Sequence, residues 1–386
     1  MDAIPCKRND FLHFLYDCRI FDFNSGRQGI FYENIAEKSV IREISKKDTS
    51  VSIAKAIAII LMVLAHTRFS VYGNVLINMF HMPLFFFFSG YCFKDKYLIS
   101  VKQFLKKRIK GIYFPYLKWS LFFLLVHNVF FAIGIYNENI GWQNRFPLKY
   151  EWSDFFYHFF SIVTKMQGHD HLLGGFWFLF TLLICSILGF GCIRLFKNPF
   201  VGIVVLLFCA VIFSFVNIRI PYFDIGSREF IATAIFVSGY ALNKIDFKKV
   251  NPFFYVLFTL FVILGSFVWP MSLLNVQTWK ILVWFLSALA GTIVVFRIAL
   301  FLNECKIERF LIFIGDNTMP ILVWHFLCFK LVSFFIIKLN DLPISYLAHF
   351  PTIEEYSRTG WWLAYLIVGV FVPLLYPLGG RVRNCK

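Results

Sequence analysis

The stretch that decides the fold class is "SIAKAIAIILMVLAH", residues 52–66, in which a run of aliphatic residues carries two ionisable side chains, Lys55 and His66. Such a run predicts a membrane helix, because about 20 apolar residues cross the hydrocarbon core of a bilayer. Lys and His are costly inside a bilayer and usually face a polar cavity. We therefore expect a functional groove on this helix. The alternatives are that Lys55 reaches the inner interface and that His66 hydrogen-bonds a neighbouring helix.

The composition of the whole chain also indicates a membrane protein. Its 386 residues are 59% hydrophobic and only 16% charged, which is far more apolar than the average soluble domain. A net charge of +16 would suggest nucleic-acid binding in a soluble protein, but membrane topology explains the basic residues here. No nucleic-acid partner is therefore expected, and the surrounding partner is membrane lipid.

Apolar windows of about 20 residues predict an all-α, polytopic bundle of about ten transmembrane helices. With a cytoplasmic N-terminus, and with basic residues near the end of a span counted with the adjoining segment, the inside segments hold 26 of the 38 Lys and Arg residues and the outside segments hold 9, while Lys55, Lys118 and Lys330 lie within spans. This distribution predicts cytoplasmic termini and a multi-pass protein of the inner or plasma membrane. We expect residues 1–50 to form a cytoplasmic extension and residues 51–380 to form the transmembrane domain. The windows lie near 51–71, 75–93, 112–136, 173–196, 199–217, 228–243, 252–270, 280–302, 318–337 and 360–378.

The spacing of Lys55 and His66 places both side chains in one groove. Eleven residues make close to three helical turns, so the two side chains share a face and lie about 16 Å apart along the axis. The following stretch, "INMFHMPLFFFFSGYCFK" (77–94), begins with Asn78 and His81. Its short connection to the first helix predicts that His66 and His81 meet at one mouth, which suggests proton chemistry. No third ligand with suitable spacing follows, so no metal site is predicted.

Several further motifs, in order, resemble the acyltransferase 3 family, and most closely its fucose 4-O-acetylase-like branch. The resemblance covers about residues 51–378. It implies an integral membrane O-acyltransferase that moves an acyl group, commonly acetyl from acetyl-CoA, onto a hydroxyl of a cell-surface glycan sugar or its lipid-linked precursor. After Lys55 and His66, the motifs are "HMPLFFFFSGY" (81–91), "FLKKRIKGIYFPY" (104–116), "GGFWFLFTLL" (174–183) and "FIGDNTMPILVWH" (313–325).

The resemblance also implies roles for individual residues. A family pattern of a basic residue followed by a histidine falls on Lys55 and His66, which implies that His66 is catalytic and that Lys55 belongs to the donor side. A second basic element falls within residues 106–108, so Lys107 and Arg108 are expected to bind the donor. Members of this branch often carry an acidic residue three places before the lysine, where this chain has Ser52. A charge partner for Lys55 is therefore absent or comes from elsewhere.

The chemistry of acyl transfer agrees with these residue types. A base must take the proton of the acceptor hydroxyl, and histidine, whose ordinary pKa is near 6.5, suits that task. His66 is the candidate base, whereas His81, Asn78 or a nearby basic residue could stabilise the oxyanion. The basic cluster that contains Arg108 would attract the phosphate groups of CoA, or it could simply anchor the inner end of a span.

Two aromatic or histidine positions are further candidates on the acceptor side. Trp177 could stack on a sugar ring or sit at the membrane interface, and His325 could serve the site or be structural. The segment 151–166 predicts an amphipathic helix in the longest outside loop. A transporter or flippase for a glycan or small solute is the alternative function. The enzyme is favoured because the charges concentrate in the first two spans and the basic segment after them, without internal repeats.

Overall fold

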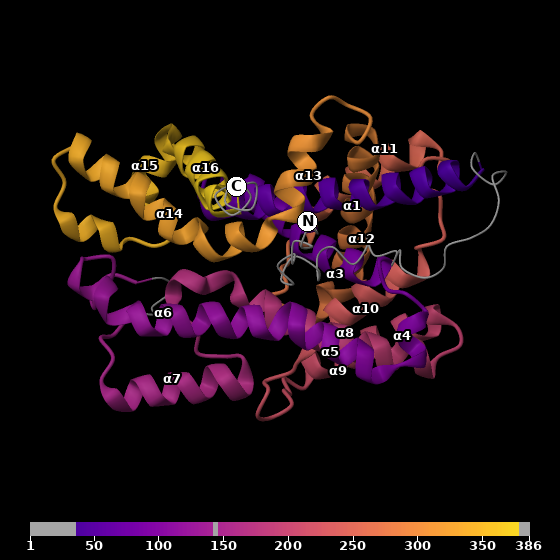
Figure 1. Ribbon diagram of the computed structural model, residues 1–386, viewed down its shortest axis with the longest axis horizontal. Helices are drawn as coiled ribbons and strands as arrows, with labels where there is room; N and C mark the ends of the chain where they lie inside the picture. The colour runs from indigo at the N-terminus through magenta and orange to yellow at the C-terminus, as the bar shows by residue number, and fades with distance from the viewer. Residues whose placement is uncertain (1–35, 142–145, 378–386) are drawn as a thin grey trace, which may run out of the picture.

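The computed structural model describes residues 36–141 and 146–377, and within these residues the chain forms helices and no strands (Figure 1). The predicted all-α class is therefore confirmed for the described part of the chain. The longer helices are α1 (Ala36–His66), α2 (Val71–Asn78), α3 (His81–Tyr91), α5 (Val101–Arg108), α6 (Phe114–Ala132), α7 (Trp152–Lys165), α8 (Trp177–Leu195), α9 (Pro199–Phe215), α10 (Ser227–Ala241), α11 (Pro252–Val268), α12 (Ile281–Leu302), α13 (Glu308–Asp316), α14 (Thr318–Leu339) and α16 (Trp362–Phe371), with short α4 (Lys96–Ile99) and α15 (Glu354–Tyr356).

Seven helical segments among the described residues are long and apolar enough to cross a bilayer, which makes the protein a multi-pass membrane protein. Two shorter apolar helices, α9 and α11, accompany them. Each of the ten predicted windows contains a helix. Besides the seven long segments and the two shorter helices α9 and α11, the remaining window, 228–243, contains α10. The count of ten spans stays a prediction, because three of these helices are shorter than a full crossing.

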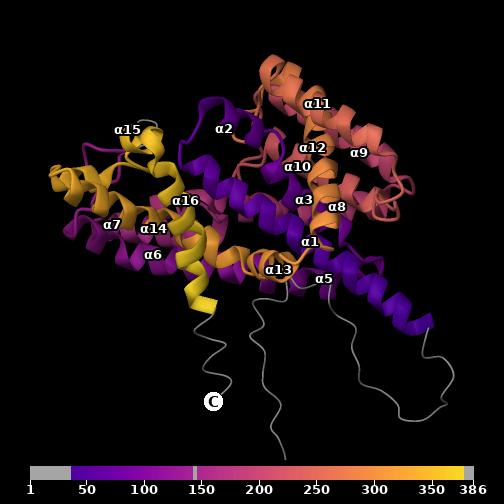
Figure 2. The same ribbon diagram turned by 90° about the horizontal axis from the view of Figure 1, so that it is seen from above.

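Helix α1 runs through the predicted boundary at residue 50 without a break. Residues 1–35 of the predicted extension lie outside the described residues. In Figure 2 the start of α1 lies on the same side of the molecule as α5, α13 and the end of α16, while α2 and α15 lie on the opposite side. The molecule thus has two faces, and α1 leads from one toward the other.

The core around α1 is built by close packing of α3, α12, α13 and α14 against it, with α10 behind α3. Glycines allow the backbones of α3 and α10 to touch. A Cβ on Gly90 would meet the carbonyl oxygen of Phe236, and a Cβ on Gly239 would meet that of Phe87. The small size of Gly90 and Gly239 thus permits this close contact, which fixes α3 beside α10.

The second predicted span is interrupted, as its sequence indicates. Helix α2 begins at Val71, and the side chain of the preceding Ser70 caps it by accepting from the backbone N–H of Gly73 at 3.1 Å. It ends at Asn78, and α3 begins at His81, with Pro83 in its first turn, where a missing N–H costs little. The break therefore sets Asn78 and His81 on either side of one corner.

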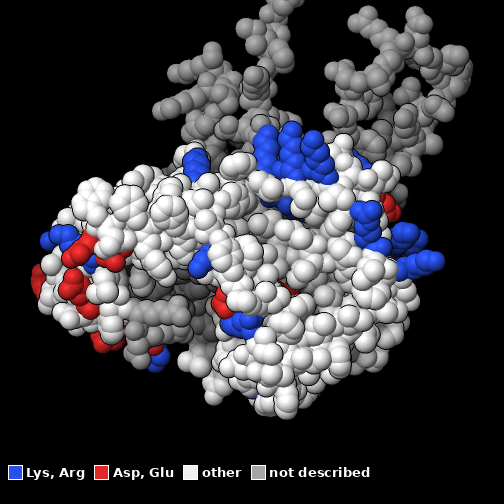
Figure 3. All heavy atoms as spheres, turned by 90° about the horizontal axis from the view of Figure 1, so that it is seen from below, with Lys and Arg blue, Asp and Glu red and all other residues white. Residues whose placement is uncertain are grey.

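The basic segment after α3 is helical rather than a loop. Helix α5 continues through a π-helical turn, Ile109–Tyr113, directly into α6. The side chains of Lys102, Lys106 and Lys110 recur every four residues and are exposed, whereas Arg108 is buried. In Figure 3 the densest groups of Lys and Arg side chains lie at the upper edge and the right of this face, and others lie scattered at its left and centre. The basic segment thus presents Lys102, Lys106 and Lys110 on the surface of the protein and Arg108 toward the protein interior.

The segment between α6 and α8 contains the predicted amphipathic helix, α7. Its Trp152, Phe156 and Phe160 side chains are exposed, while Ile162 is buried. The same segment is tied to α6 by the buried carboxylate of Asp170, whose Oδ2 lies 2.6 Å from Nδ1 of His127 and whose Oδ1 accepts from Tyr136 and the backbone of Leu172.

Candidate active site

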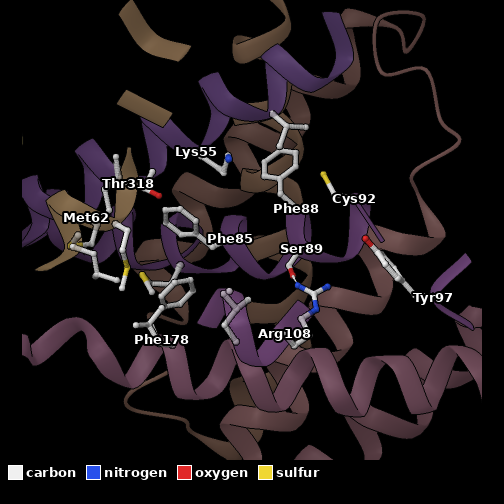
Figure 4. Close-up of a pocket in the computed structure, with 18 residues that line it drawn as sticks. Lys55, Met62, Phe85, Phe88, Ser89, Cys92, Tyr97, Arg108, Phe178 and Thr318 are labelled. Atoms are coloured by element: carbon white, nitrogen blue, oxygen red, sulfur yellow. Dashed lines mark hydrogen bonds between the residues drawn. The ribbon is translucent and has the colours of Figure 1, made fainter. Parts of the chain in front are cut away.

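A cavity of about 100 Å³ lies between α1, α3, α5, α8 and α14. Figure 4 shows Lys55 of α1 and Arg108 of α5 on opposite walls of this cavity, which we call the inner cavity, with Met62 toward one end and Tyr97 at the other. Most of its remaining lining is apolar, and it includes Phe85 and Phe178. Two basic side chains thus face a mostly apolar space, an arrangement that suits an elongated ligand with an anionic end.

The Arg108 side chain is held in this cavity by its neighbours. Its Nη1 donates to Ser89 Oγ at 3.4 Å, and its guanidinium lies 5.2 Å from the centre of the Phe104 ring. Lys107 does not line the cavity, but its Nζ donates to the hydroxyl of Tyr97 at 2.9 Å. Burial raises the pKa of Tyr97, and Arg108 opposes that effect, so this hydroxyl stays neutral at neutral pH. Lys107 thus acts on the cavity through Tyr97.

A carboxylate reaches the Lys55 region from a distant part of the chain. Ser52 Oγ donates to Oδ1 of the buried Asp316 at 2.7 Å. Residues 52 and 55 lie one turn apart on the same face of α1. The contact is possible because Gly315 has no side chain, as a Cβ there would meet the carbonyl oxygen of Ser52. The acidic group that the sequence lacks at position 52 is therefore supplied through space by α13.

A second cavity of about 70 Å³, the outer cavity, is lined by His66, Asn78, His81 and Trp177. The structure thus brings together four of the residues singled out in the sequence. A short segment between α11 and α12 completes the wall through Ser272, Leu273 and Leu274, and no sequence motif indicated it. His325 does not line the cavity, but its ring packs on that of His66 with centroids 5.5 Å apart.

Hydrogen bonds fix the tautomers of two of these histidines. His81 Nδ1 donates to the carbonyl oxygen of Ile77 at 2.8 Å, so its Nε2 carries the lone pair when the ring is neutral. His325 Nδ1 likewise donates to the carbonyl oxygen of Ile321 at 2.9 Å. Its Nε2 is buried with no hydrogen-bond partner among the described residues. Neutral His81 and His325 can therefore accept a proton or hydrogen bond at Nε2 but cannot donate one there.

Arg228, which no sequence motif indicated, lies beside Trp177. The guanidinium of Arg228 is 5.5 Å from the centre of the Trp177 ring. Its Nε donates to Oε1 of the fully buried Glu229 at 2.6 Å, and Thr181 donates to the same oxygen. These contacts hold Arg228 in place, and Arg228 in turn supports the indole that forms part of the outer wall.

The two cavities meet at one side of α1. Both are lined by Met62, Met82 and Leu322, which come from α1, α3 and α14. The α1 residues that line the two cavities are Val51, Lys55, Ile59, Met62 and His66. This confirms that Lys55 and His66 share one helix face, with the apolar Met62 between them.

The comparisons with known proteins identify the family. The family model described as an acyltransferase domain matches residues 48–376, which is most of the chain. The chain belongs to the acyltransferase 3 family. No curated protein matches it, and no solved structure matches it. This acyltransferase 3 protein is therefore a multi-pass membrane protein whose family indicates acyltransferase activity, and its two cavities are the candidate active site.

The described residues of this acyltransferase contain no group of three His, Cys, Asp or Glu side chains that could hold a metal ion. The catalytic role of His66 and the donor roles of Lys55, Lys107 and Arg108 stay predictions. The structure places Lys55 and Arg108 in the inner cavity and His66 in the outer one.

Proposed function

We propose that this protein transfers an acetyl group from acetyl-CoA to a hydroxyl of a cell-surface glycan sugar or of its lipid-linked precursor. The observation that carries the proposal is the meeting of a basic inner cavity and a histidine-lined outer cavity at Met62, Met82 and Leu322. Acyl transfer needs one site for an anionic thioester and another for a hydroxyl, and it needs both to reach one base. The two cavities supply these three requirements.

The inner cavity takes the donor. CoA carries phosphate groups at one end and its thioester at the end of a thin pantetheine arm. Arg108 is suited to the phosphates because its guanidinium can form two parallel hydrogen bonds to them, and Lys55 adds positive charge on the opposite wall. Lys107 supports this wall through Tyr97. The exposed lysines of α5 attract the anionic donor toward the inner cavity.

The outer cavity takes the acceptor. Trp177 offers an aromatic face to a sugar ring, and Asn78 offers amide N–H groups. In the reaction, a nitrogen of His66 removes the proton of the acceptor hydroxyl while its oxygen attacks the thioester carbon. The amide of Asn78 stabilises the negative charge that develops on the carbonyl oxygen. The carbon–sulfur bond then breaks, His66 returns the proton to the sulfur, and CoA leaves as the thiol.

Membrane topology gives each substrate its own side. In a topology of ten spans with both termini in the cytoplasm, Lys55 lies near the cytoplasmic boundary of the membrane. His66 lies about 16 Å farther along α1, toward the outside. Acetyl-CoA then enters from the cytoplasm, and the glycan approaches from outside. The exposed lysines of α5 agree with this orientation, because α5 lies on the same side of the molecule as the start of α1 (Figure 2).

Sealed vesicles of known orientation test the proposal. Acetyl-CoA with a labelled acetyl group is supplied only on the cytoplasmic side, and membrane-impermeant glycan acceptors are supplied only on the outer side. The expected result is labelled acceptor outside, which is lost in vesicles with the His66→Ala variant. Label that appears only when both substrates share the cytoplasmic side would overturn the sidedness, and no transfer in either arrangement would overturn the function.

A further inference from the structure

The boundary between the two cavities is a single layer of apolar side chains. Met62, Met82 and Leu322 line both cavities, and we call these three residues the partition. Met62 and Leu322 are buried, and Met82 is partly buried. None of these side chains carries a strong hydrogen-bonding group. The partition therefore suits contact with an apolar group of a substrate and not with the charged or hydroxylated parts of either substrate.

The partition lies beside the reacting atoms in the proposed function. Met62 is one helical turn from His66, or about 6 Å along the axis, and about 10 Å from Lys55. A thioester that reaches His66 from the inner cavity must therefore place its acyl chain against the partition. The groups that contact the acyl chain are the thioether of Met62, that of Met82 and the methyl groups of Leu322.

The space on the far side of Leu322 is already filled. A Cβ built on Gly175, which lines the outer cavity, would lie 2.8 Å from Leu322 Cδ1. The Leu322 side chain therefore packs directly on the backbone of residue 175 and cannot retreat in that direction. Extra methylene groups inserted into a packed apolar layer force side chains out of their rotamers, which is unfavourable.

Resting on the proposed function, we propose that the partition sets the length of the acyl group, so that the protein accepts acetyl thioesters and rejects longer ones. One methylene group too many in an apolar pocket changes relative rates by about 10- to 200-fold. Butyryl-CoA has two more methylene groups than acetyl-CoA. The wild-type protein should therefore favour acetyl-CoA over butyryl-CoA by at least about 100-fold in kcat/KM.

Trimming the partition should relax this preference. In Met62→Ala and in Met82→Ala, the space left by the thioether can hold the longer chain. Each variant is expected to lower the acetyl-to-butyryl ratio at least tenfold. Met82→Phe, which adds bulk, is expected to leave the ratio at the wild-type value or above it.

Met79→Ala is the matched control. Met79 is fully buried between α2 and α3 but lines neither cavity. This substitution removes a methionine side chain, as Met62→Ala and Met82→Ala do, but leaves the partition intact. The acetyl-to-butyryl ratio should therefore equal that of the wild type. Binding of free CoA checks that each variant is folded, because free CoA has no acyl chain to place against the partition.

The experiment measures the CoA thiol released from acetyl-CoA and from butyryl-CoA by purified protein in lipid vesicles that contain a glycan extract of the host membrane. Unchanged ratios in Met62→Ala and Met82→Ala, in protein that binds CoA, would overturn the inference and leave the proposed function intact. The same conclusion follows if the wild type uses both thioesters equally. A wild-type protein that binds no CoA and turns over neither thioester would overturn the proposed function itself.

Discussion

His66 can be tested as the catalytic base by replacing it with alanine. A positioned general base contributes about 10² to 10⁴ in rate, which corresponds to about 3 to 5 kcal/mol of activation free energy. His66 lies in the outer cavity and does not line the inner one with Lys55 and Arg108. The substitution should therefore lower kcat by that factor and leave the KM for acetyl-CoA nearly unchanged.

The structure also supplies a matched comparison for this experiment. His81 lines the same cavity and presents its Nε2 as an acceptor, but it starts α3 rather than ending α1. His81→Ala should lower kcat by only about tenfold if it supports the site without removing the proton. The assay is transfer of labelled acetyl to membrane glycans, with the amount of each variant in the membrane measured in parallel.

Two outcomes of this assay would count against the reasoning. If His66→Ala keeps turnover within tenfold of the wild type at equal protein level, His66 is not the base. If His81→Ala loses more activity than His66→Ala, the proton is removed from the α3 side of the cavity. The ring of His66 contacts Phe326 and His325, so the protein level must be checked before either conclusion is drawn.

Three further predictions concern the donor site, the carboxylate near Lys55 and stability. Arg108→Ala should weaken CoA binding about 10- to 100-fold in titration calorimetry, because a charge-assisted hydrogen bond contributes about 1.5–3 kcal/mol, whereas the exposed Lys106→Ala should change it little. Equal effects would contradict the inward role of Arg108. Asp316→Asn should lower acetyl-CoA turnover about tenfold, and adding Ser52→Asp should restore part of it by returning a carboxylate to this face of α1; no recovery would contradict the charge role. Burial lowers the pKa of His169 to about 4, so the unfolded chain binds a proton that the folded chain does not. Stability is then full above pH 6.5 and falls by about 3 kcal/mol as the pH drops to about 4. His169→Gln should flatten this part of the pH profile of the unfolding temperature in detergent, and unchanged profiles would refute it.

The elements of the fold could be predicted because their signals are local. A run of apolar residues predicts a helix wherever it occurs, and each of the ten windows contains one. The break before Pro83 and the shared face of Lys55 and His66 also follow from local geometry, since a helix turns by a fixed angle per residue. These features need no knowledge of what packs against the segment.

The candidate site could be predicted only in part, because its walls come from segments far apart in the chain. Asp316 reaches Ser52 across 264 residues, and no sequence spacing records that contact. The direction of each basic side chain on α5 depends on what α3 and α8 place opposite it. Sequence reasoning therefore found Lys107 and Arg108 together, whereas packing sends Arg108 into the cavity and Lys107 to Tyr97.

The apolar step on α1 explains how one helix can carry Lys55 and His66 without joining them in a continuous polar channel. A groove lined by charges from end to end would admit water, and water competes with the acceptor hydroxyl for the thioester. Met62 interrupts the face between the two ionisable residues, and Met82 and Leu322 close the gap from α3 and α14. Methionine suits this position because its unbranched side chain fills an irregular gap between packed helices. The same three side chains thus separate the cavities when they are empty and contact the acyl group when the donor is bound.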